Sequence, residues 1–527
     1  MTKENAYFYQ ALTPDDMRRT EQMAFDRGVP SLLLMEHAAI AVVDALQQAL
    51  GGSCQNKTAL FLCGTGNNGG DGLAAARLFR GRGGIPVVWL SGSPKTPDAN
   101  TNLQWLRQLA GVEILRLDEL PEDELPFDDE NRPREFFDAY VDALLGTGLR
   151  GAPEGLTQRM LLAPDRDRDP AAVRLAVDIP SGIDGATGAV PGACFRADVT
   201  VTFHAPKLGL YLTGRRDAVG RIVVADIGLD DLAYDPAPWR AQPLQVWCRV
   251  SAPRLFKTSR PINAHKGDCG RILIYAGSMG MAGAAAMCAK AAVTAGAGLT
   301  TVACPQDVMP ILQTLTPNAM CADITRAVEQ PSAYDVLALG CGLSQSEEIW
   351  QNILRLWDPA KPSVWDADAL NLLSLHPMSL GKNAVITPHP GEAARLLGWR
   401  IEEATRDKLL TARALAEKYG CTAVLKGDVT VICVMSGQTP YYWLNVTGSP
   451  ALAKGGSGDA LTGILAVCVH DALPLGSEWD LAKSAARACL WHGLAAIAGA
   501  ERYGERELTT AQLIDCLHAA ETRRDDG

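Results

Sequence analysis

A glycine-rich run close to the C-terminal end holds the residue types with the clearest chemical potential. Residues 453–459 read Ala-Lys-Gly-Gly-Ser-Gly-Asp and lead into an apolar helical stretch. Glycines at the mouth of a helix expose backbone N–H groups where the helix dipole favours an anion. The aspartate that follows, Asp459, can take a proton from a hydroxyl. The run therefore predicts phosphoryl transfer to an alcohol; a glycine-rich turn with a solvated aspartate is the alternative.

A second glycine-rich loop follows a predicted strand in the first half of the chain. Residues 64–72 read Gly-Thr-Gly-Asn-Asn-Gly-Gly-Asp-Gly and precede a predicted helix at 73–79. They contain Gly-x-Gly-x-x-Gly, the pattern of dinucleotide-binding dehydrogenases, which place an acidic residue about 20 positions later. The next predicted strand ends in Leu-Ser-Gly at 90–92 with no carboxylate. The sequence therefore argues against an oxidoreductase.

Amide and carboxylate side chains follow several strands of the first half. Asn67 and Asn68 lie in the glycine loop, while Asp142 and Asp178 stand at two further strand ends. Such oxygen donors suit a hard cation. A second glycine loop at 146–151, which contains Arg150, is suited to a pyrophosphate, and Asp178 is suited to act as an acid or base. Each aspartate could instead cap a turn.

The second half carries a series of glycine- or aspartate-bearing strand ends. They are His-Lys-Gly-Asp at 265–268, Gly-Cys-Gly-Leu at 340–343, Asp-Ala-Asp-Ala-Leu-Asn at 366–371, Thr-Pro-His-Pro-Gly-Glu at 387–392 and Lys-Gly-Asp-Val-Thr at 426–430. Ligands in α/β sheets bind at the carboxyl ends of strands. Taken singly, each segment is also compatible with a tight turn.

Length, composition and charge limit the classes of protein. The 527 residues exceed one ordinary domain, and 47% hydrophobic with 21% charged residues is typical of a soluble globular chain. A net charge of −11 argues against nucleic-acid or anionic-membrane partners, so a phosphate ligand needs local positive charge. The 14 cysteines are scattered singly, as in reduced cytoplasmic proteins. Neither a secretory signal nor a membrane span is expected.

Apolar strand-like runs alternate with helical stretches in both halves, which predicts α/β domains with mainly parallel sheets. The predicted strands are 59–63, 86–90, 140–144, 175–179, 199–203 and 221–225, then 271–275, 299–303, 336–339, 363–366, 384–387, 422–426 and 429–434. The proline-rich segment 230–245 predicts a boundary between domains at 1–228 and 251–527, joined by a linker at 229–250.

Four motifs in residues 12–228 resemble the NAD(P)H-hydrate epimerases. They are Leu-Met-Glu at 34–36, the asparagine–glycine loop at 66–72, Asp-Ile-Pro-Ser-Gly at 178–182 and Thr-Phe-His-Ala-Pro-Lys at 202–207. The resemblance implies a Rossmann-like three-layer α/β/α sandwich with Asp178 as a catalytic residue facing the nicotinamide, and a potassium ion held by Asn68, Asp142 and Ser181. The residues it implies for binding the hydrated cofactor are Asn67, Asn68, Gly69, Gly70, Asp71, Gly146, Thr147, Gly148, Leu149, Arg150, Gly151, Ala152 and Asp178.

The strand-end motifs of residues 250–520 together resemble the ADP-dependent NAD(P)H-hydrate dehydratases, which are ribokinase-like α/β proteins. The resemblance makes Asp459 the catalytic base. It implies contacts with the hydrated cofactor from Ala284, Gly342, His389 and Asp459. It implies contacts with ADP or AMP from Lys426, Gly427, Asp428, Val429, Thr430 and Gly458. At residues 37–39 and 447–451 the sequence differs from the usual motifs of the two families.

The two resemblances imply a bifunctional repair enzyme. The first half would interconvert the R and S forms of hydrated NADH and NADPH, and the second would dehydrate the S form while ADP becomes AMP and phosphate. Potassium and magnesium ions, a cytoplasmic location and a homo-oligomer are expected. The alternative is a ribokinase-like small-molecule kinase with a non-catalytic nucleotide-binding N-terminal module, because kinase and dehydratase share the glycine–aspartate run.

Overall fold

The computed structural model describes residues 8–121, 125–126, 137–149, 151–167, 171–229, 247–251, 260, 262–330, 333–477 and 479–522. The chain divides into two compact units, one formed by residues 10–246 and the other by residues 1–9 and 247–527. The predicted boundary segment 230–245 lies outside the described residues.

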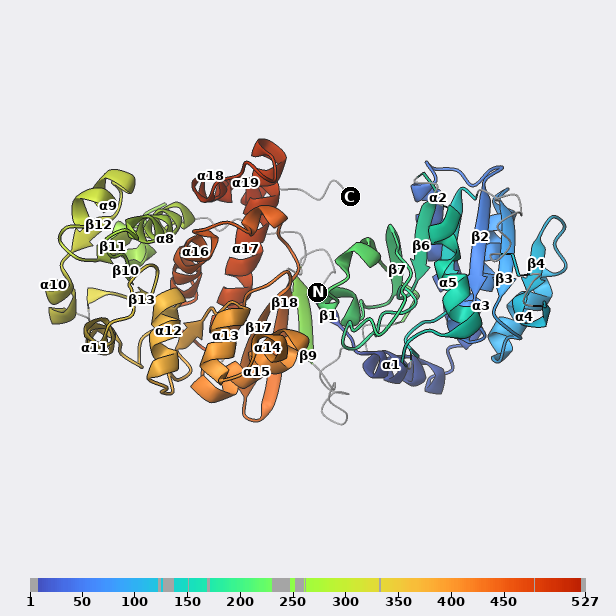
Figure 1. The fold of residues 1–527 in the computed structure, drawn as a ribbon, viewed down its shortest axis with the longest axis horizontal. Helices are drawn as coiled ribbons and strands as arrows, with labels where there is room; N and C mark the ends of the chain where they lie inside the picture. Colours follow the sequence, from blue (N-terminus) through green and yellow to red (C-terminus); the bar gives the residue numbers. More distant parts are fainter. Residues whose placement is uncertain are drawn as a thin grey trace. The chain divides into compact units, whose positions relative to one another are not determined.

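The unit of residues 10–246 is built on a parallel sheet with the strand order β4-β3-β2-β5-β6-β7-β8. Its strands are β2 (Thr58–Cys63), β3 (Ile85–Leu90), β4 (Glu113–Arg116), β5 (Ala139–Ala143), β6 (Val173–Val177), β7 (Val199–Phe203) and β8 (Arg221–Ala225). Its helices are α1 (Pro14–Asp26), α2 (Ser31–Ala49), α3 (Asn67–Gly81), α4 (Pro97–Leu106), α5 (Gly155–Asp167) and α6 (Gly209–Leu212). Helices α2, α3 and α4 pack together on one face of the sheet and α5 covers the other (Figure 1), which gives a three-layer sandwich.

Helix α2 is the one described helix long and apolar enough to cross a membrane by length and composition, with a mean hydropathy of 1.2. The sequence did not predict such a stretch. In the structure Val42, Val43 and Leu46 are fully buried, and α2 contacts α3 and strands β6, β7 and β8. Its apolar face therefore belongs to the core of this unit.

The other unit contains a mixed sheet with the strand order β1-β9-β18-β17-β16-β15-β14-β13-β10-β11-β12. Its strands are β1 (Phe8–Ala11), β9 (Trp247–Ser251), β10 (Arg271–Tyr275), β11 (Leu299–Ala303), β12 (Met320–Ala322), β13 (Val336–Leu339), β14 (Ser363–Trp365), β15 (Ala384–Ile386), β16 (Thr422–Leu425), β17 (Thr430–Ser436) and β18 (Thr439–Asn445). Strands β10 to β16 pair in parallel, whereas β16, β17 and β18 form antiparallel pairs. The carboxyl ends of the parallel strands therefore meet at one edge of the sheet.

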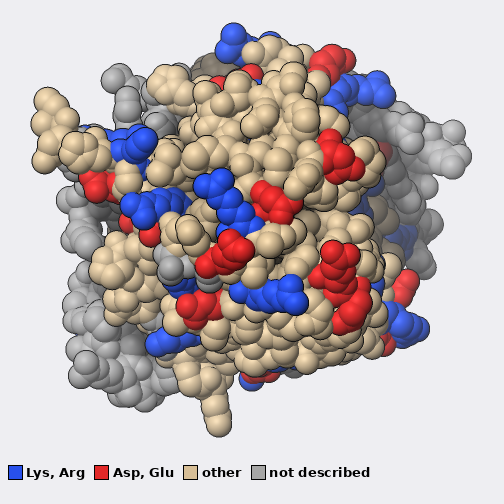
Figure 2. Space-filling view, turned by 90° about the vertical axis from the view of Figure 1, so that its left-hand side faces the viewer, with Lys and Arg blue, Asp and Glu red and all other residues tan. Residues whose placement is uncertain are grey.

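Two layers of helices cover this sheet (Figure 1). One contains α8 (Ala282–Ala295), α9 (Met309–Leu315), α16 (Ser457–His470) and α17 (Asp480–Tyr503), and the other contains α10 (Ile324–Glu329), α11 (Glu347–Leu356), α12 (Ala367–Leu375), α13 (Pro390–Leu397), α14 (Ile401–Arg406) and α15 (Lys408–Tyr419). The chain continues through α18 (Thr510–Asp515) and α19 (Leu517–Thr522). On the face shown in Figure 2, basic and acidic side chains are interspersed rather than gathered by sign.

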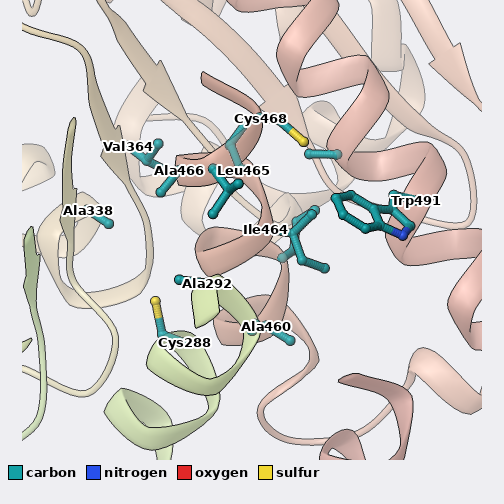
Figure 3. Packing of buried hydrophobic residues seen from close by; sticks show 14 of the residues in the cluster. Cys288, Ala292, Ala338, Val364, Ala460, Ile464, Leu465, Ala466, Cys468 and Trp491 are labelled. Carbon is teal, nitrogen blue, oxygen red and sulfur yellow. The ribbon is translucent and has the colours of Figure 1, made fainter. Parts of the chain in front are cut away.

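Helix α16 is the central helix of the C-terminal core (Figure 3). Its residues Ala460, Ile464 and Leu465 are buried among side chains of α8 and α17. Gly463 allows α8 to come close, because a Cβ there would lie 2.2 Å from the carbonyl oxygen of Cys288. This packing fixes the position of the glycine run at the N-terminus of α16.

The predicted α/β fold class with two parallel-sheet domains is confirmed. Every predicted strand overlaps an observed one, with ends that agree within two residues. The sequence did not predict β1, β4, β9, β12 or β18, and it placed the start of α3 at residue 73, whereas the helix begins at Asn67. The second half of the glycine loop is therefore already the first turn of a helix.

Candidate functional site

Four strand ends and one helix N-terminus meet in the C-terminal unit. Cys341 follows β13, Asp366 follows β14, His389 follows β15 and Lys426 follows β16. Asp459 lies in the first turn of α16. Gly458, the residue before Asp459, lies close to two of these charged groups, since a Cβ on it would be 3.4 Å from Nζ of Lys426 and 3.6 Å from Oδ2 of Asp366. This edge is the place where ligands bind in open α/β sheets.

Asp459 combines partial burial with a specific hydrogen-bond donor. Burial raises the pKa of its carboxyl group, the Cys341 thiol donates a hydrogen bond that lowers it, and the Asp366 carboxylate raises it further. The net result is a pKa above the ordinary aspartate value. A carboxylate with a raised pKa is a better proton acceptor, as a general base requires.

Two of the predicted contacts of the hydrated cofactor, Gly342 and Ala284, lie against each other. Gly342 has a φ of +65°, and a Cβ on it would lie 2.9 Å from the Cβ of Met281 and 3.1 Å from the Cβ of Ala284. The loop after β13 therefore lies against the start of α8 without room for a side chain. Cys341, next to Gly342, contacts Asp459.

Lys426 is the cation at the mouth of the glycine run. Its ammonium group lies 2.7 Å from Oδ1 of Asp366 and 4.0 Å from Oε2 of Glu392. A Cβ on Gly458 would lie 3.4 Å from Nζ of Lys426. Burial disfavours the charge on Lys426, but the two carboxylates raise its pKa above the ordinary lysine value. This lysine supplies the local positive charge that a phosphate ligand requires.

His389 is the N-cap of α13 and shares a capping box with Glu392. Its ring Nδ1 accepts a hydrogen bond from the backbone N–H of Gly391 at 3.0 Å, and the backbone N–H of His389 donates to Oε2 of Glu392 at 2.8 Å. Burial, then Lys426 and Arg395, lower the pKa of His389, so its ring is neutral at neutral pH. Burial raises the pKa of Glu392 to about 7.

The other predicted nucleotide contacts lie in the turn between β16 and β17. Asp428 is exposed and forms an ion pair with Lys408 at 2.5 Å, while Val429 is buried. Gly427 is exposed and Thr430 begins β17. The turn offers a nucleotide mainly its backbone, together with the side chain of Lys426.

Polar contacts from neighbouring segments hold the glycine run in place. Nζ of Lys454 donates a hydrogen bond to the carbonyl of Leu508 at 2.6 Å, and Oγ1 of Thr510 donates to the carbonyl of Gly455 at 2.9 Å. Gly456, with a φ of +89°, is the N-cap of α16. The N–H groups of the first turn of α16 are thus presented by a fixed loop.

In the N-terminal unit, two of the predicted potassium ligands contact each other directly. Oδ1 of Asp142 accepts a hydrogen bond from Oγ of Ser181 at 2.7 Å, and Oδ2 accepts one from the Ser181 N–H at 2.7 Å. Asp142 is fully buried, and burial raises its pKa to about 6. A buried carboxylate of this kind is more stable as an anion when a cation lies beside it.

The third predicted ligand, Asn68, lies against the second glycine loop. A Cβ on Gly146 would lie 3.4 Å from Oδ1 of Asn68, and Nδ2 of Asn68 is buried without a hydrogen-bond partner among the described residues. Gly146 adjoins Leu145, whose N–H donates to Oγ of Ser181 at 2.9 Å. Amide, carboxylate and hydroxyl oxygens gathered in this way fit a hard cation such as potassium. Among the described residues, no cluster of three or more His, Cys, Asp or Glu side chains suggests a transition-metal site.

Asp178 forms a buried ion pair that its motif alone did not assign. Nζ of Lys207 lies 2.5 Å from Oδ1 of Asp178, and Oγ1 of Thr202 donates to the same oxygen at 3.1 Å. Lys207 is 1% exposed and also donates to the carbonyl of Phe203 at 3.1 Å. Asp178 has a φ of +66°, which a non-glycine residue rarely adopts. Strain of this kind concentrates at functional sites.

Two further carboxyl groups face the same pair. Burial raises the pKa of Asp71, and the negative charges of Asp178 and Glu21 raise it further. Burial also raises the pKa of Glu21, while Lys207 lowers it. Around Lys207 the site therefore contains its ion-pair partner, Asp178, and two carboxyl groups that hold a proton more readily.

The remaining predicted residues of the N-terminal site differ in their burial. Asn67 begins α3 and is exposed. In the second glycine loop Gly148, Gly151 and Ala152 are exposed, and Thr147 and Leu149 are half-buried. Gly69 is buried against the backbone of Gly64, and Gly70 is buried against Met35 of α2 and Ala99 of α4. Arg150 lies outside the described residues.

Several residues of these sites were not assigned from the sequence. Lys207, Asp366, Cys341 and Glu392 lie inside motifs that had been singled out, so their types and strand-end positions were available signals. Thr462 lies one helical turn after Gly458, to whose carbonyl its hydroxyl donates at 3.2 Å. Glu21 lies on α1, far from every motif, and only the tertiary structure places it beside Lys207.

Comparisons with known proteins divide the chain as the fold does. Residues 31–209 match the family model described as YjeF-related protein N-terminus, and residues 272–518 match the model described as NAD(P)H-hydrate dehydratase. The chain is 39% identical over 515 residues to the bifunctional NAD(P)H-hydrate repair enzyme Nnr of Escherichia coli, covering 95% of this chain and 92% of that protein. It is 35% identical over 529 residues to the protein of the same name from Moorella thermoacetica, covering 96% and 95%. The solved ADP/ATP-dependent NAD(P)H-hydrate dehydratase of Bacillus subtilis, co-crystallised with ATP and Mg²⁺, is 28% identical with a TM-score of 0.43, covering 51% of this chain and 94% of that one.

The fold and the two sites define a Rossmann-like sandwich joined to a ribokinase-like α/β domain, each with its ligand groups at strand ends. Its relatives match it over nearly its full length. The chain belongs to the family of bifunctional NAD(P)H-hydrate repair enzymes.

Proposed function

We propose that this protein restores hydrated NADH and NADPH in two steps. The N-terminal site interconverts the R and S forms of the hydrate, and the C-terminal site dehydrates the S form while ADP is converted to AMP and phosphate. The observation that carries the proposal is the placement of a carboxylate with a raised pKa, Asp459, beside both the glycine run and the ammonium group of Lys426. Family membership supports the same pair of activities.

In the dehydration step, Asp459 takes the proton from the hydroxyl of the hydrated nicotinamide ring. The resulting alkoxide attacks the terminal phosphorus of ADP, a new phosphorus–oxygen bond forms, and AMP leaves. The N–H groups at the start of α16 and the ammonium group of Lys426 stabilise the charge on the transferred group. The bond between the ring carbon and the ester oxygen then breaks, driven by the lone pair of the ring nitrogen, and inorganic phosphate leaves. Loss of a proton from the neighbouring ring carbon restores the dihydropyridine.

The transfer of a phosphoryl group to the substrate hydroxyl explains why the site resembles that of a kinase. Hydroxide is a poor leaving group, whereas phosphate leaves readily from the ester when the ring nitrogen donates its lone pair. No phosphorylated product is released, because the ester breaks down while it is bound. The neutral His389 ring, the Gly342 loop and Ala284 would hold the hydrated cofactor, and Lys426 to Thr430 with Gly458 would hold the nucleotide.

In the N-terminal site, Asp178 would face the nicotinamide and move the proton that allows the hydroxyl-bearing carbon to change its configuration. Lys207 holds the Asp178 carboxylate in place through their buried ion pair, and removal of the cation would leave that carboxylate without its charged partner. The loops at 67–71 and 146–152 would bind the remainder of the dinucleotide. A potassium ion would be held by Asn68, Asp142 and Ser181, where it would supply a fixed positive charge between the two loops.

Magnesium is proposed to accompany the nucleotide, because this ion is normally bound through phosphate oxygens with only one or two protein carboxylates. A homo-oligomer and a cytoplasmic location stay predictions. The number of subunits can be measured by sedimentation equilibrium of the purified chain.

Separated R and S hydrates distinguish this function from a kinase. Each is incubated with the full chain and ADP or ATP, and the absorbance of reduced nicotinamide is followed. We expect the S form to return to NADH only when the nucleotide is present, and the R form to follow through epimerisation. A stable phosphorylated product of another alcohol, with no recovery of NADH, would instead support the kinase alternative.

A further inference from the structure

Asp366 uses its side chain in an unusual way for its position. It is the N-cap residue of α12, where an aspartate normally accepts a hydrogen bond from the first helical turn. Its side chain makes no such bond. Instead Oδ1 lies 2.7 Å from Nζ of Lys426, and Oδ2 accepts a hydrogen bond from Oγ1 of Thr462 at 2.8 Å. The carboxylate, 2% exposed, thus joins β16 to α16 at the mouth of the glycine run.

The backbone around Asp366 is held in a conformation that permits this use. Ala367 has a φ of +49°, which is unfavourable for a residue with a Cβ. Gly340 lies so close that a Cβ on it would be 1.8 Å from the carbonyl oxygen of Asp366. An unused cap and a strained neighbour both cost stability. A residue that serves only to stabilise the helix would not need either of them.

The contacts of Asp366 converge on the place where phosphate would bind. A Cβ on Gly458 would lie 3.4 Å from Nζ of Lys426 and 3.6 Å from Oδ2 of Asp366. Thr462 ties the same carboxylate to the first turn of α16, because its hydroxyl also lies 3.2 Å from the carbonyl of Gly458. One carboxylate therefore sets the position of the ammonium group relative to the N–H groups of that turn.

We infer that Asp366 is a positioning residue that holds the Lys426 ammonium group against the phosphoryl group during its transfer. This inference rests on the proposed dehydration and adds a residue whose effect passes entirely through Lys426. Since Nζ of a lysine has three donors, one can bind Asp366 while the others face the nucleotide. Without the carboxylate, the flexible lysine chain has other directions available, including toward Glu392 at 4.0 Å.

The test is a double-mutant cycle with Asp366→Asn and Lys426→Met in the full chain. Asparagine retains the shape and the N-cap ability of aspartate but lacks its charge. We expect Asp366→Asn to lower kcat for dehydration by about 10- to 100-fold, within the range seen when one donor to a developing charge is lost. The KM for the S hydrate should change by less than about twofold, because Asp366 does not bind that substrate. In the Lys426→Met background, adding Asp366→Asn should cause almost no further loss.

A pH profile gives a readout that a purely structural role would not change. The titratable or charged groups that face Lys426 are Asp366, Glu392, Cys341, His389, Asp459 and His492. The reaction needs protonated Lys426, so activity falls as the pH rises through its pKa, and loss of the Asp366 charge should move this alkaline limb to lower pH. The matched control is Asp407→Asn. Asp407 is also an N-cap aspartate, but its Oδ1 accepts a hydrogen bond from the N–H of Leu410 in its own helix at 2.9 Å. This substitution should leave the pH profile unchanged.

Two measurements separate failure of this inference from failure of the proposed function. The thermal unfolding temperature of the C-terminal unit reports whether that unit is folded, and calorimetric titration with ADP reports binding without turnover. Asp366→Asn should weaken ADP binding several-fold. If the wild-type protein recovers NADH but the two substitutions reduce the rate additively, the positioning role is wrong. If the wild-type protein recovers no NADH with either nucleotide, the proposed function is wrong, whatever the variants do.

Discussion

At the scale of single residues, the chemistry depends on groups whose surroundings oppose their ordinary ionisation. Asp459 and Asp142 are carboxyl groups with pKa values raised by burial, whereas Asp178 has the Lys207 cation beside it. His492, buried behind Ser457, has a pKa lowered to about 4 and stays neutral. Groups of this kind cluster at functional sites because catalysis needs them there.

Asp459→Asn should abolish the nucleotide-dependent recovery of NADH, because an amide cannot accept the hydroxyl proton. We expect a loss of at least about 100-fold, the size typical of a removed general base. Epimerisation of the hydrate, measured by chromatography of its R and S forms, should remain at the wild-type rate. Recovery at a normal rate in this variant would show that another group is the base.

Cys341 offers a pH test of the same assignment. Its thiol donates to the Asp459 carboxylate and lowers the pKa of that group. Asp459 acts as a base only when ionised, so activity falls as the pH drops through its pKa. Cys341→Ala removes the donor, raises the pKa and should shift the acid limb of kcat/KM to higher pH, while Cys341→Ser retains a donor and should restore the limb. Identical profiles in the two variants would contradict the hydrogen-bonded role of the thiol.

Asp178→Ala should have the opposite effect to Asp459→Asn. The S hydrate should be dehydrated normally, whereas the R hydrate should persist at the rate of spontaneous epimerisation. Lys207→Met should resemble it, because the buried Asp178 carboxylate loses its ion-pair partner. Disappearance of both forms at wild-type rates in these variants would mean that the N-terminal site lies elsewhere.

At the scale of elements, the sequence predicted the central strands and missed the edges. The apolar runs Ile-Leu-Ile-Tyr at 272–275 in β10 and Val-Leu-Ala-Leu at 336–339 in β13 are typical of parallel strands buried on both faces. Strands β4 and β12 lie at sheet edges, are short and are only partly buried, so their composition lacks such a run. The pairing of β1 with a sheet formed from residues far along the chain depends on tertiary structure, which local pattern cannot reveal.

The site residues divide in the same way. The glycine run predicted Asp459 at the start of a helix. Gly342, His389 and Lys426 lie in strand-end motifs, which a parallel sheet gathers at one edge, and the resemblance to the dehydratases gave them their expected roles. The partners that tune these groups, such as Thr462, come from contacts between elements. The burial of a particular side chain, and hence its pKa, depends on the packing of the whole unit. It could therefore not be predicted from the sequences of the motifs.

The α8–α16 contact should be intolerant of any side chain at Gly463. A Cβ there would lie 2.2 Å from the carbonyl of Cys288, so Gly463→Ala must separate the two helices. Overpacking of this kind typically costs about 1–3 kcal/mol. The thermal unfolding temperature of the C-terminal unit should therefore fall. Gly283→Ala on α8, where a Cβ meets nothing within 4 Å, is the matched control and should not lower it. An unchanged midpoint for Gly463→Ala would contradict the close packing.

Potassium should stabilise the N-terminal unit through Asp142. Replacement of potassium by choline, which is too large for the site, should lower the unfolding temperature of the wild-type protein and its epimerase rate. Asp142→Asn should remove this dependence on potassium, since the buried anion is gone. A variant that retains the full potassium effect would show that the ion binds elsewhere.

At the scale of the whole molecule, the chain contains two α/β units, each with its own sheet and its own site. The two activities should therefore be separable by single substitutions. When Asp459→Asn and Asp178→Ala proteins are mixed, the mixture should convert both hydrates to NADH, because each supplies the site that the other lacks. A mixture that fails although each remaining site is active alone would mean that the substrate must stay within one chain.

The central claim is that the C-terminal site phosphorylates a hydroxyl in order to expel it. This can be tested with S hydrate whose ring hydroxyl carries oxygen-18, incubated with the full chain and ADP. The account predicts that the labelled oxygen leaves in inorganic phosphate, detected by mass spectrometry, with one AMP formed for each NADH. Label found in water, with unlabelled phosphate, would contradict it.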